Sequence, residues 1–302
     1  MVLGRKREDI ERRIWILGTV VPAILLLLIV SYFPITYAIF LSFVKKTAFS
    51  PDISWVGLKN YFWLLTEPDL WASLGRSIVF TVGSVVLQIG CGMVMALLLN
   101  RTFRGQSLAR SLVILPYLLP TIVVGLVFKW LLNQDYGAIN QVLLQWKLVQ
   151  MPINFFGGLN SALYSITATT SWQYTSFVVL MVLARLQAIN PKLYEAAMVN
   201  GAGPLRCFFD VTLPNLKTTL FLLALLRGIW MFNKFDLIYI ITGGGPLQAT
   251  ETLPVYAYRI AFEDFDFGRA AAVCTIMFLV LALGSLIYFK LFDPSKEVEV
   301  GR

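Results

Sequence analysis

The sequence predicts an all-α integral membrane protein with about six transmembrane helices. Three observations support this fold class. Of the 302 residues, 58% are hydrophobic and only 14% are charged, whereas a soluble domain carries about 25% charged residues. Leu, Ile, Val and Phe fill repeated runs of about 20 residues, the length at which a helix crosses a bilayer. Lys and Arg are concentrated in alternate connections between these runs.

Six apolar runs give the expected membrane spans. They cover roughly Ile14–Phe43, Ser77–Leu99, Leu112–Leu132, Ala162–Ala184, Thr218–Ile241 and Arg269–Phe289. The first run is too long for a signal peptide, and no small-residue cleavage site follows it, so we expect it to remain as a helix. Several runs contain proline, which membrane helices tolerate where neighbours satisfy the freed carbonyl.

The positive charges predict the orientation of these spans. Lys and Arg are frequent before the first run, after the second, after the fourth and after the sixth, and they are scarce in the other connections. Because positive charge stays in the cytoplasm, both termini are expected inside the cell. We therefore expect a cytoplasmic segment 1–13, a transmembrane domain 14–290 and a cytoplasmic tail 291–302. The net charge of +8 does not indicate nucleic-acid binding, because the basic residues do not form one face.

Residues for common enzymatic and ATP-binding chemistry are missing from the sequence. It contains no histidine, which removes Ser-His-Asp, Cys-His and His-metal sites. The three cysteines form no CxxC pair, so neither a zinc site nor a disulfide framework is indicated. The run Gly243–Gly245 is followed by Pro246 and lacks the Lys and hydroxyl of a P-loop. We expect a non-catalytic chain without a metal or cofactor of its own.

The connection of about 186–217 is the longest one on the cytoplasmic side. "PKLYEAAMV" predicts a helix after Pro191, "GAGP" predicts a turn, and "LRCFFDVTL" predicts a second short helix that Pro214 ends. The small residues Ala196 and Ala197 allow another protein to approach closely. From this pattern alone, a protein-binding surface and an interfacial helix lying on lipid are both consistent with the sequence.

The same connection resembles the EAA loop in the permease subunits of ABC importers. Glu195-Ala196-Ala197, three residues, Gly201, nine residues and Val211-Thr212-Leu213-Pro214 meet every spacing of the pattern EAA-x3-G-x9-I-x-LP. Val211 replaces the usual isoleucine, and Asn200 stands where the family usually has aspartate. Four longer stretches resemble the maltose-type carbohydrate-uptake branch: "WVGLKNYFWLLTEPDLWASL", "LPYLLPTIVVGLVFKWLLNQDYGAIN", "FNKFDLIYIITGGGP" and "TLPVYAYRIAFEDFDFGRAAA".

This resemblance implies the type I ABC importer permease fold and a function in sugar transport across a bacterial inner membrane. It implies that the EAA loop is a coupling helix seated on an ATP-hydrolysing subunit, with Glu195, Ala196, Ala197, Gly201, Leu213 and Pro214 at the contact. The implied partners are two ABC ATPase subunits, which bind ATP and Mg²⁺, a second homologous permease, a periplasmic or surface solute-binding protein and the saccharide. An ion-coupled secondary carrier is the alternative, but the predicted spans contain only one carboxylate, Asp236.

The fifth and fourth spans hold the expected substrate site. Arg227 and Lys234 are seven residues apart, a spacing that places them on one helical face with Met231. The resemblance adds Asn233 from the fifth span and Gln173, Tyr174 and Phe177 from the fourth. Two cations in this region indicate an acidic saccharide, such as a uronate oligomer. The alternative is that Arg227 is structural and pairs with the other permease while Lys234 extends outward.

Overall fold

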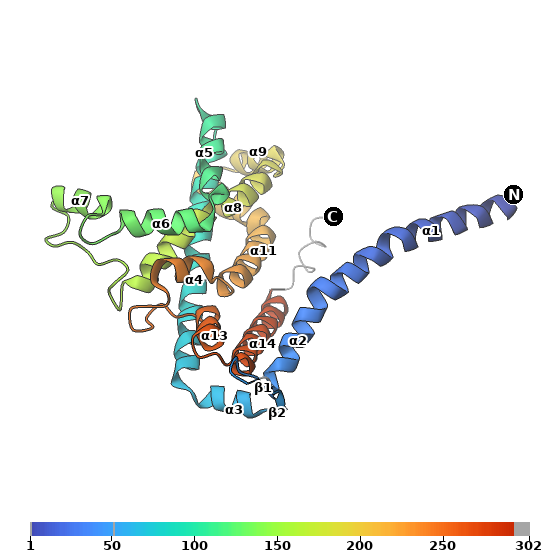
Figure 1. The fold of residues 1–302 in the computed structure, drawn as a ribbon. Coiled ribbons are helices and arrows are strands. Elements are labelled where there is room, and N and C mark those ends of the chain that lie inside the picture. Colours follow the sequence, from blue (N-terminus) through green and yellow to red (C-terminus); the bar gives the residue numbers. More distant parts are fainter. Residues whose placement is uncertain (1, 51, 293–302) are drawn as a thin grey trace. The chain divides into compact units, whose positions relative to one another are not determined.

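The structure is a computed structural model of the chain and describes residues 2–50 and 52–292 (Figure 1). Regular structure in these residues is helical apart from one short β-hairpin, which confirms the predicted all-α class. Most of the predicted tail 291–302 lies outside the described residues. The chain divides into two compact units, Met1–Glu67 with Ala257–Phe278 and Pro68–Tyr256 with Leu279–Arg302.

The first predicted span is helical throughout. α1 (Val2–Leu27) continues through a π-helical turn, η1 (Leu28–Tyr32), into α2 (Phe33–Ser42). The Phe33 N–H donates to the Leu28 carbonyl, five residues back. Pro34 follows, and a proline has no N–H and crowds the carbonyl four residues before it. The wider π turn therefore lets the helix pass the proline without a break.

After the first span, the first unit continues with a short, tightly bonded segment. β1 (Val44–Lys45) pairs antiparallel with β2 (Ser54–Trp55), and α3 (Lys59–Thr66) follows. The buried Asn60 amide donates to the carbonyls of Ser42 and Val44, at 2.9 and 3.0 Å. These bonds satisfy backbone groups at the end of α2 and fix the hairpin beside it. α13 (Leu253–Phe262) and α14 (Phe267–Leu291) are the last helices of the chain.

Two long helices form the centre of the second unit. α4 (Pro68–Leu99) packs along α8 (Ala162–Gln187). The buried residues of α4 recur every three or four positions, and six of the nine are small or polar: Ser73, Ser77, Ser84, Gln88, Gly92 and Ala96. Small residues let two membrane helices approach closely. At Gly92 a Cβ would lie 2.8 Å from Val178 Cβ, so this approach requires glycine.

The third predicted span is not one straight helix. α5 (Gln106–Leu118) and α6 (Thr121–Leu131) meet at 96°. Pro120 explains the break, because it holds Leu119 in an extended conformation and cannot donate into the α5 ladder. α7 (Ala138–Gln145) follows in the connection to α8. Figure 1 shows α6 running across the direction of α5 and leading to α7.

The connection of about 186–217 and the fifth span also differ from the prediction. α9 (Pro191–Val199) is the predicted first helix, but Pro214 does not end the second. α10 (Pro204–Cys207), η2 (Phe208–Thr212) and α11 (Leu213–Phe232) are continuous. The π turn η2 directly precedes Leu213-Pro214, as η1 precedes Phe33-Pro34. The fifth span is interrupted, because α11 ends at Phe232 and α12 (Asp236–Thr242) starts after a gap.

Six membrane spans remain compatible with these corrections. Among the described residues, four helices are long and apolar enough to cross a membrane, and the number reaches six if each of two bent pairs is one span. The pairs are α5 with α6 and α8 with α9, the latter bent by 68°.

Candidate functional site

Two interrupted spans of the second unit meet beside α8. One interruption is the α5–α6 corner at Leu119-Pro120, and the other is the gap between α11 and α12. α6 packs on α12, and α12 also contacts α8. Gln173 of α8 reaches the corner, where its Nε2 donates to the Leu119 carbonyl at 3.1 Å. An amide thus satisfies a carbonyl freed by the break, which is the condition for irregular backbone at membrane depth.

Tyr174 connects both interruptions. Its hydroxyl lies 3.3 Å from Thr121 Oγ1 at the start of α6 and accepts from Lys234 Nζ at 2.5 Å. Lys234 belongs to the gap after α11, and its Nζ lies 2.8 Å from Asp236 Oδ1 at the start of α12. The Lys234 side chain is only 10% exposed, so it does not extend outward as the alternative interpretation expected.

Arg227 lies on α11 and is 1% exposed. Its Nε donates to Gln88 Oε1 of α4 at 2.7 Å, and a terminal nitrogen lies 3.7 Å from the Met231 sulfur. Gln88 Nε2 also contacts this sulfur, at 3.4 Å. The guanidinium is therefore enclosed by residues of its own chain.

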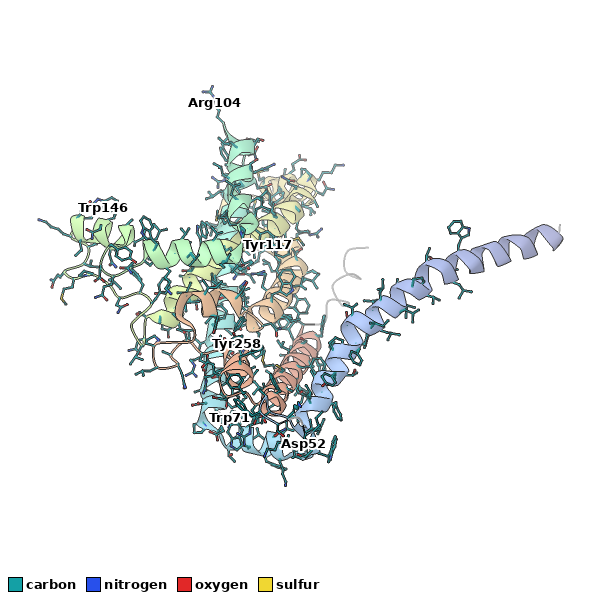
Figure 2. All side chains as sticks on the ribbon, in the orientation of Figure 1. Asp52, Trp71, Arg104, Tyr117, Trp146 and Tyr258 are labelled. Carbon is teal, nitrogen blue, oxygen red and sulfur yellow. The ribbon has the colours of Figure 1, made fainter. Side chains whose placement is uncertain are left out.

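Aromatic rings surround this guanidinium. Its Cζ lies 4.9 Å from the ring centroid of Tyr174, 5.3 Å from that of Trp230 and 5.9 Å from that of Phe177. Tyr117 contacts Tyr174 and Phe177, with centroids 6.0 and 5.9 Å apart. Figure 2 labels Tyr117 near the corner where α5 turns into α6. Aromatic faces attract cations, and they also offer flat apolar surfaces to a sugar ring.

The structure brings together most of the predicted substrate residues. Arg227, Met231, Lys234, Tyr174 and Phe177 are neighbours, and Gln173 reaches the α5–α6 corner beside them. Asn233 is exposed and turns back to the Ile229 carbonyl at 2.9 Å.

The expectation that Arg227 and Lys234 share one helical face is wrong, because α11 ends between them. Both side chains instead contact Tyr174. Sequence reasoning missed Gln88, Tyr117 and Thr121, and it noticed Asp236 without its partner. A lone amide within an apolar run was the available signal for Gln88.

The EAA segment forms a capped helix followed by a sharp turn. Pro191 is the first residue of α9, and the Asn190 side chain accepts from the Lys192 N–H at 3.0 Å. At the other end the Gly201 N–H donates to the Met198 carbonyl and the Ala202 N–H to the Ala197 carbonyl, at 2.9 and 3.0 Å. This is a Schellman motif, whose left-handed residue is Gly201 with φ +80°.

The outer face of this segment is open. Glu195 and Ala196 are exposed, whereas Ala197 packs partly against the core of α4, α8 and α11. Val199 is 88% exposed, and the apolar side chains of Leu193, Met198 and Leu205 are also exposed. The Asn200 amide donates to the Ala196 carbonyl at 2.9 Å, so this side chain caps its own helix.

The inner face of the segment is fixed to the following helix. The Tyr194 hydroxyl lies 3.0 Å from Thr212 Oγ1, in the π turn η2. Leu213 and Pro214 follow as the first two residues of α11. Arg185 Nε, near the end of α8, donates to the Asn215 carbonyl at 3.0 Å. α9 is therefore bonded to the helix that carries Arg227.

Polar and charged side chains at interruptions of membrane-length helices are the arrangement of a membrane transport protein. The fold and these contacts define that class. The chain belongs to the family of binding-protein-dependent transport system inner membrane components, whose sequence model matches residues 88–298. This confirms the predicted ABC importer permease family.

Relatives along nearly the whole chain agree with this assignment. The chain is 32% identical to the probable ABC transporter permease protein YurN of Bacillus subtilis, over 92% of this chain and 95% of that protein. It is 32% identical to the trehalose/maltose transport system permease protein MalF of Thermococcus litoralis, over 90% and 91% of the two chains. It is 32% identical to the sulfoquinovosyl glycerol transport system permease protein SmoG of Agrobacterium fabrum, over 94% and 92%.

A solved structure shares the fold. A chain in the crystal structure of a bacterial alginate ABC transporter, in complex with an alginate pentasaccharide-bound periplasmic protein, aligns with a TM-score of 0.82. The sequence identity is 19%, and the alignment covers 94% of this chain and 96% of that chain. The predicted type I ABC importer permease fold is thereby confirmed.

Proposed function

We propose that this chain is the membrane-spanning permease subunit of an ATP-driven importer that carries a sugar or oligosaccharide from an extracytoplasmic binding protein to the cytoplasm. The observation that carries the proposal is the group of Arg227, Lys234 and Tyr174 with neighbouring rings at two helix interruptions, in a member of this family. Relatives named for trehalose or maltose and for sulfoquinovosyl glycerol support a saccharide cargo.

The substrate site comprises Arg227, Met231, Lys234, Tyr174 and Phe177, with Gln173 and Asn233 at its edges. Rings pack on the apolar faces of sugars, and charged or amide groups bind their polar substituents. Because both interruptions border this group, a shift of α6 or α12 changes its shape, which suits a site that must open to each side of the membrane in turn.

α9 is the contact for the ATPase subunits. Its exposed Glu195 and Ala196 and the neighbouring apolar side chains form a surface for a protein groove, and Gly201, Leu213 and Pro214 join that surface to α11. Two ATPase subunits hold ATP and Mg²⁺, and a second homologous permease completes the membrane part. The protein is a multi-pass protein of the bacterial inner membrane with both termini in the cytoplasm, as the Lys and Arg distribution supports.

Reconstitution tests this function. The complete importer, with its binding protein outside and ATP inside proteoliposomes, is expected to accumulate a labelled saccharide from a panel of neutral and acidic oligosaccharides. Uptake should require ATP and should continue when an uncoupler removes ion gradients. Uptake driven by an ion gradient without ATP would contradict the proposal and favour a secondary carrier.

The carrier alternative has less physical support than it had from the sequence. An ion-coupled carrier uses a membrane carboxylate that is available to bind its ion. Asp236, the carboxylate within the predicted spans, already pairs with Lys234 at 2.8 Å.

A further inference from the structure

The two cations of the substrate site differ in how their charge is balanced. Lys234 Nζ lies 2.8 Å from Asp236 Oδ1 and 3.1 Å from Oδ2. Asp236 is only two residues further along the chain, so the local backbone holds the pair together. The charge of Lys234 is therefore already compensated, and its ammonium also donates to the Tyr174 hydroxyl.

Arg227 has no such compensation. Among the described residues, no carboxylate lies within ion-pair distance of its guanidinium, and the Gln88 amide oxygen is its one oxygen acceptor. A guanidinium has five N–H donors in a planar fork. Nε uses one donor on Gln88, and one terminal nitrogen contacts the Met231 sulfur. The two terminal nitrogens can together bind two oxygens of one oxyanion. In the described part of the chain, neither of them lies within hydrogen-bond distance of an oxygen.

Tyr174 lies against both cations. Its ring centroid is 4.9 Å from Arg227 Cζ and 4.5 Å from Lys234 Nζ. The hydroxyl contacts to Thr121 and Lys234 hold the ring in this place. Since Arg227 is 1% exposed, a ligand reaches its terminal nitrogens only after one of the surrounding rings turns aside. Lys234 therefore positions Tyr174, while Arg227 offers the unused donors.

We propose that Arg227 is the specificity-determining residue for a saccharide that carries an anionic group, and that Lys234 does not bind this group. The proposal rests on the proposed function. It narrows the expectation from the sequence, in which both cations faced the cargo. A carboxylate, sulfonate or phosphate on the sugar supplies the paired oxygens that the guanidinium fork lacks. The aromatic rings around Arg227 then meet the apolar faces of the same sugar.

Direct binding to the purified importer complex in nanodiscs tests the proposal. The probes are a uronate trisaccharide and the same trisaccharide with its carboxyl groups reduced to alcohols, measured by calorimetry at low salt. We expect the acid to bind about 10- to 100-fold more tightly, as a charge-assisted hydrogen bond allows. Glucose 6-sulfonate and glucose 6-phosphate, each compared with glucose, distinguish the three kinds of anion.

Two matched variants assign the preference to one residue. Arg227→Gln should remove the difference in affinity between the acid and the alcohol. Lys234→Gln should retain the difference. If the wild-type complex binds the charged and the neutral saccharide of every probe pair with equal affinity, the proposal is overturned. This result does not depend on whether a variant folds. A preference that survives Arg227→Gln, or that only Lys234→Gln removes, would also overturn it. If no saccharide of either charge binds, the proposed function fails as well.

Discussion

Replacing Gln88 by Leu tests whether Arg227 depends on a single amide for its place in the membrane domain. Both side chains are buried, and Gln88 Oε1 accepts from Arg227 Nε at 2.7 Å. Leu is close to Gln in size, so the change removes the acceptor and leaves little empty space. A hydrogen bond to a charged group contributes about 1.5–3 kcal/mol. We expect the free energy of unfolding to fall by about 1.5–3 kcal/mol.

A double-mutant cycle makes this prediction specific. Unfolding by SDS in mixed micelles is measured for the wild type, Gln88→Leu, Arg227→Met and the double variant. Arg227→Met alone should cost less than Gln88→Leu, since the Gln88 amide still contacts the Met231 sulfur. The double variant leaves neither an unpaired charge nor an unpaired amide, so it should be more stable than Gln88→Leu. Strictly additive losses would refute the reasoning, because they would mean that the two groups do not depend on each other.

Three further predictions concern the EAA segment and the energy source. Glu195→Lys should abolish ATP-driven uptake in vesicles, while an immunoblot shows an unchanged amount of the protein in the membrane. Glu195→Gln should reduce uptake less. Normal uptake by the Lys variant would contradict the proposed coupling role. Gly201→Val should destabilise the protein by about 1–2 kcal/mol, because φ is +80° there. Gly203→Ala is the matched control at φ −75°, and equal losses of thermal stability would argue against the Schellman explanation. The purified chain alone should neither bind a fluorescent ATP analogue nor hydrolyse ATP, and binding would show an unrecognised nucleotide site.

The spans and the helix and turn of the EAA segment were predictable because their signals are local. A run of about 20 apolar residues has the length at which a helix crosses the hydrocarbon core of a bilayer. The EAA spacing places Gly201 just after a helix, and the observed left-handed φ is what a helix end commonly requires of a glycine. Neither inference depends on which segments become neighbours in space.

The effect of each proline could not be predicted from the sequence. Pro34 and Pro214 each follow a π turn and leave their helices continuous, whereas Pro120 ends α5 and produces a 96° bend. The difference lies in which hydrogen-bond partners the surrounding residues offer. At Leu119 the freed carbonyl finds the Gln173 amide, and that contact joins residues 54 positions apart, which no local pattern reveals.

The arrangement of the proposed substrate residues could not be predicted from the sequence. The seven-residue spacing of Arg227 and Lys234 suggested a shared helical face, but the helix ends at Phe232. Once Lys234 leaves the helix, it can turn to Asp236, two residues further on, a pairing that helical spacing does not allow. Arg227 remains without a carboxylate partner among the described residues, and its amide partner Gln88 lies 139 residues away on α4.

One helix links the EAA segment to the proposed substrate site. The continuous stretch Pro204–Phe232 is 29 residues long, which corresponds to about 43 Å at 1.5 Å per residue. It starts beyond the turn at Gly201, it carries Arg227, and it ends where Lys234 meets Tyr174. The Tyr194–Thr212 contact fixes α9 to its first part. α9 is therefore bonded to one continuous helix whose far end borders the proposed substrate site, and the interruption before Asp236 separates this helix from α12.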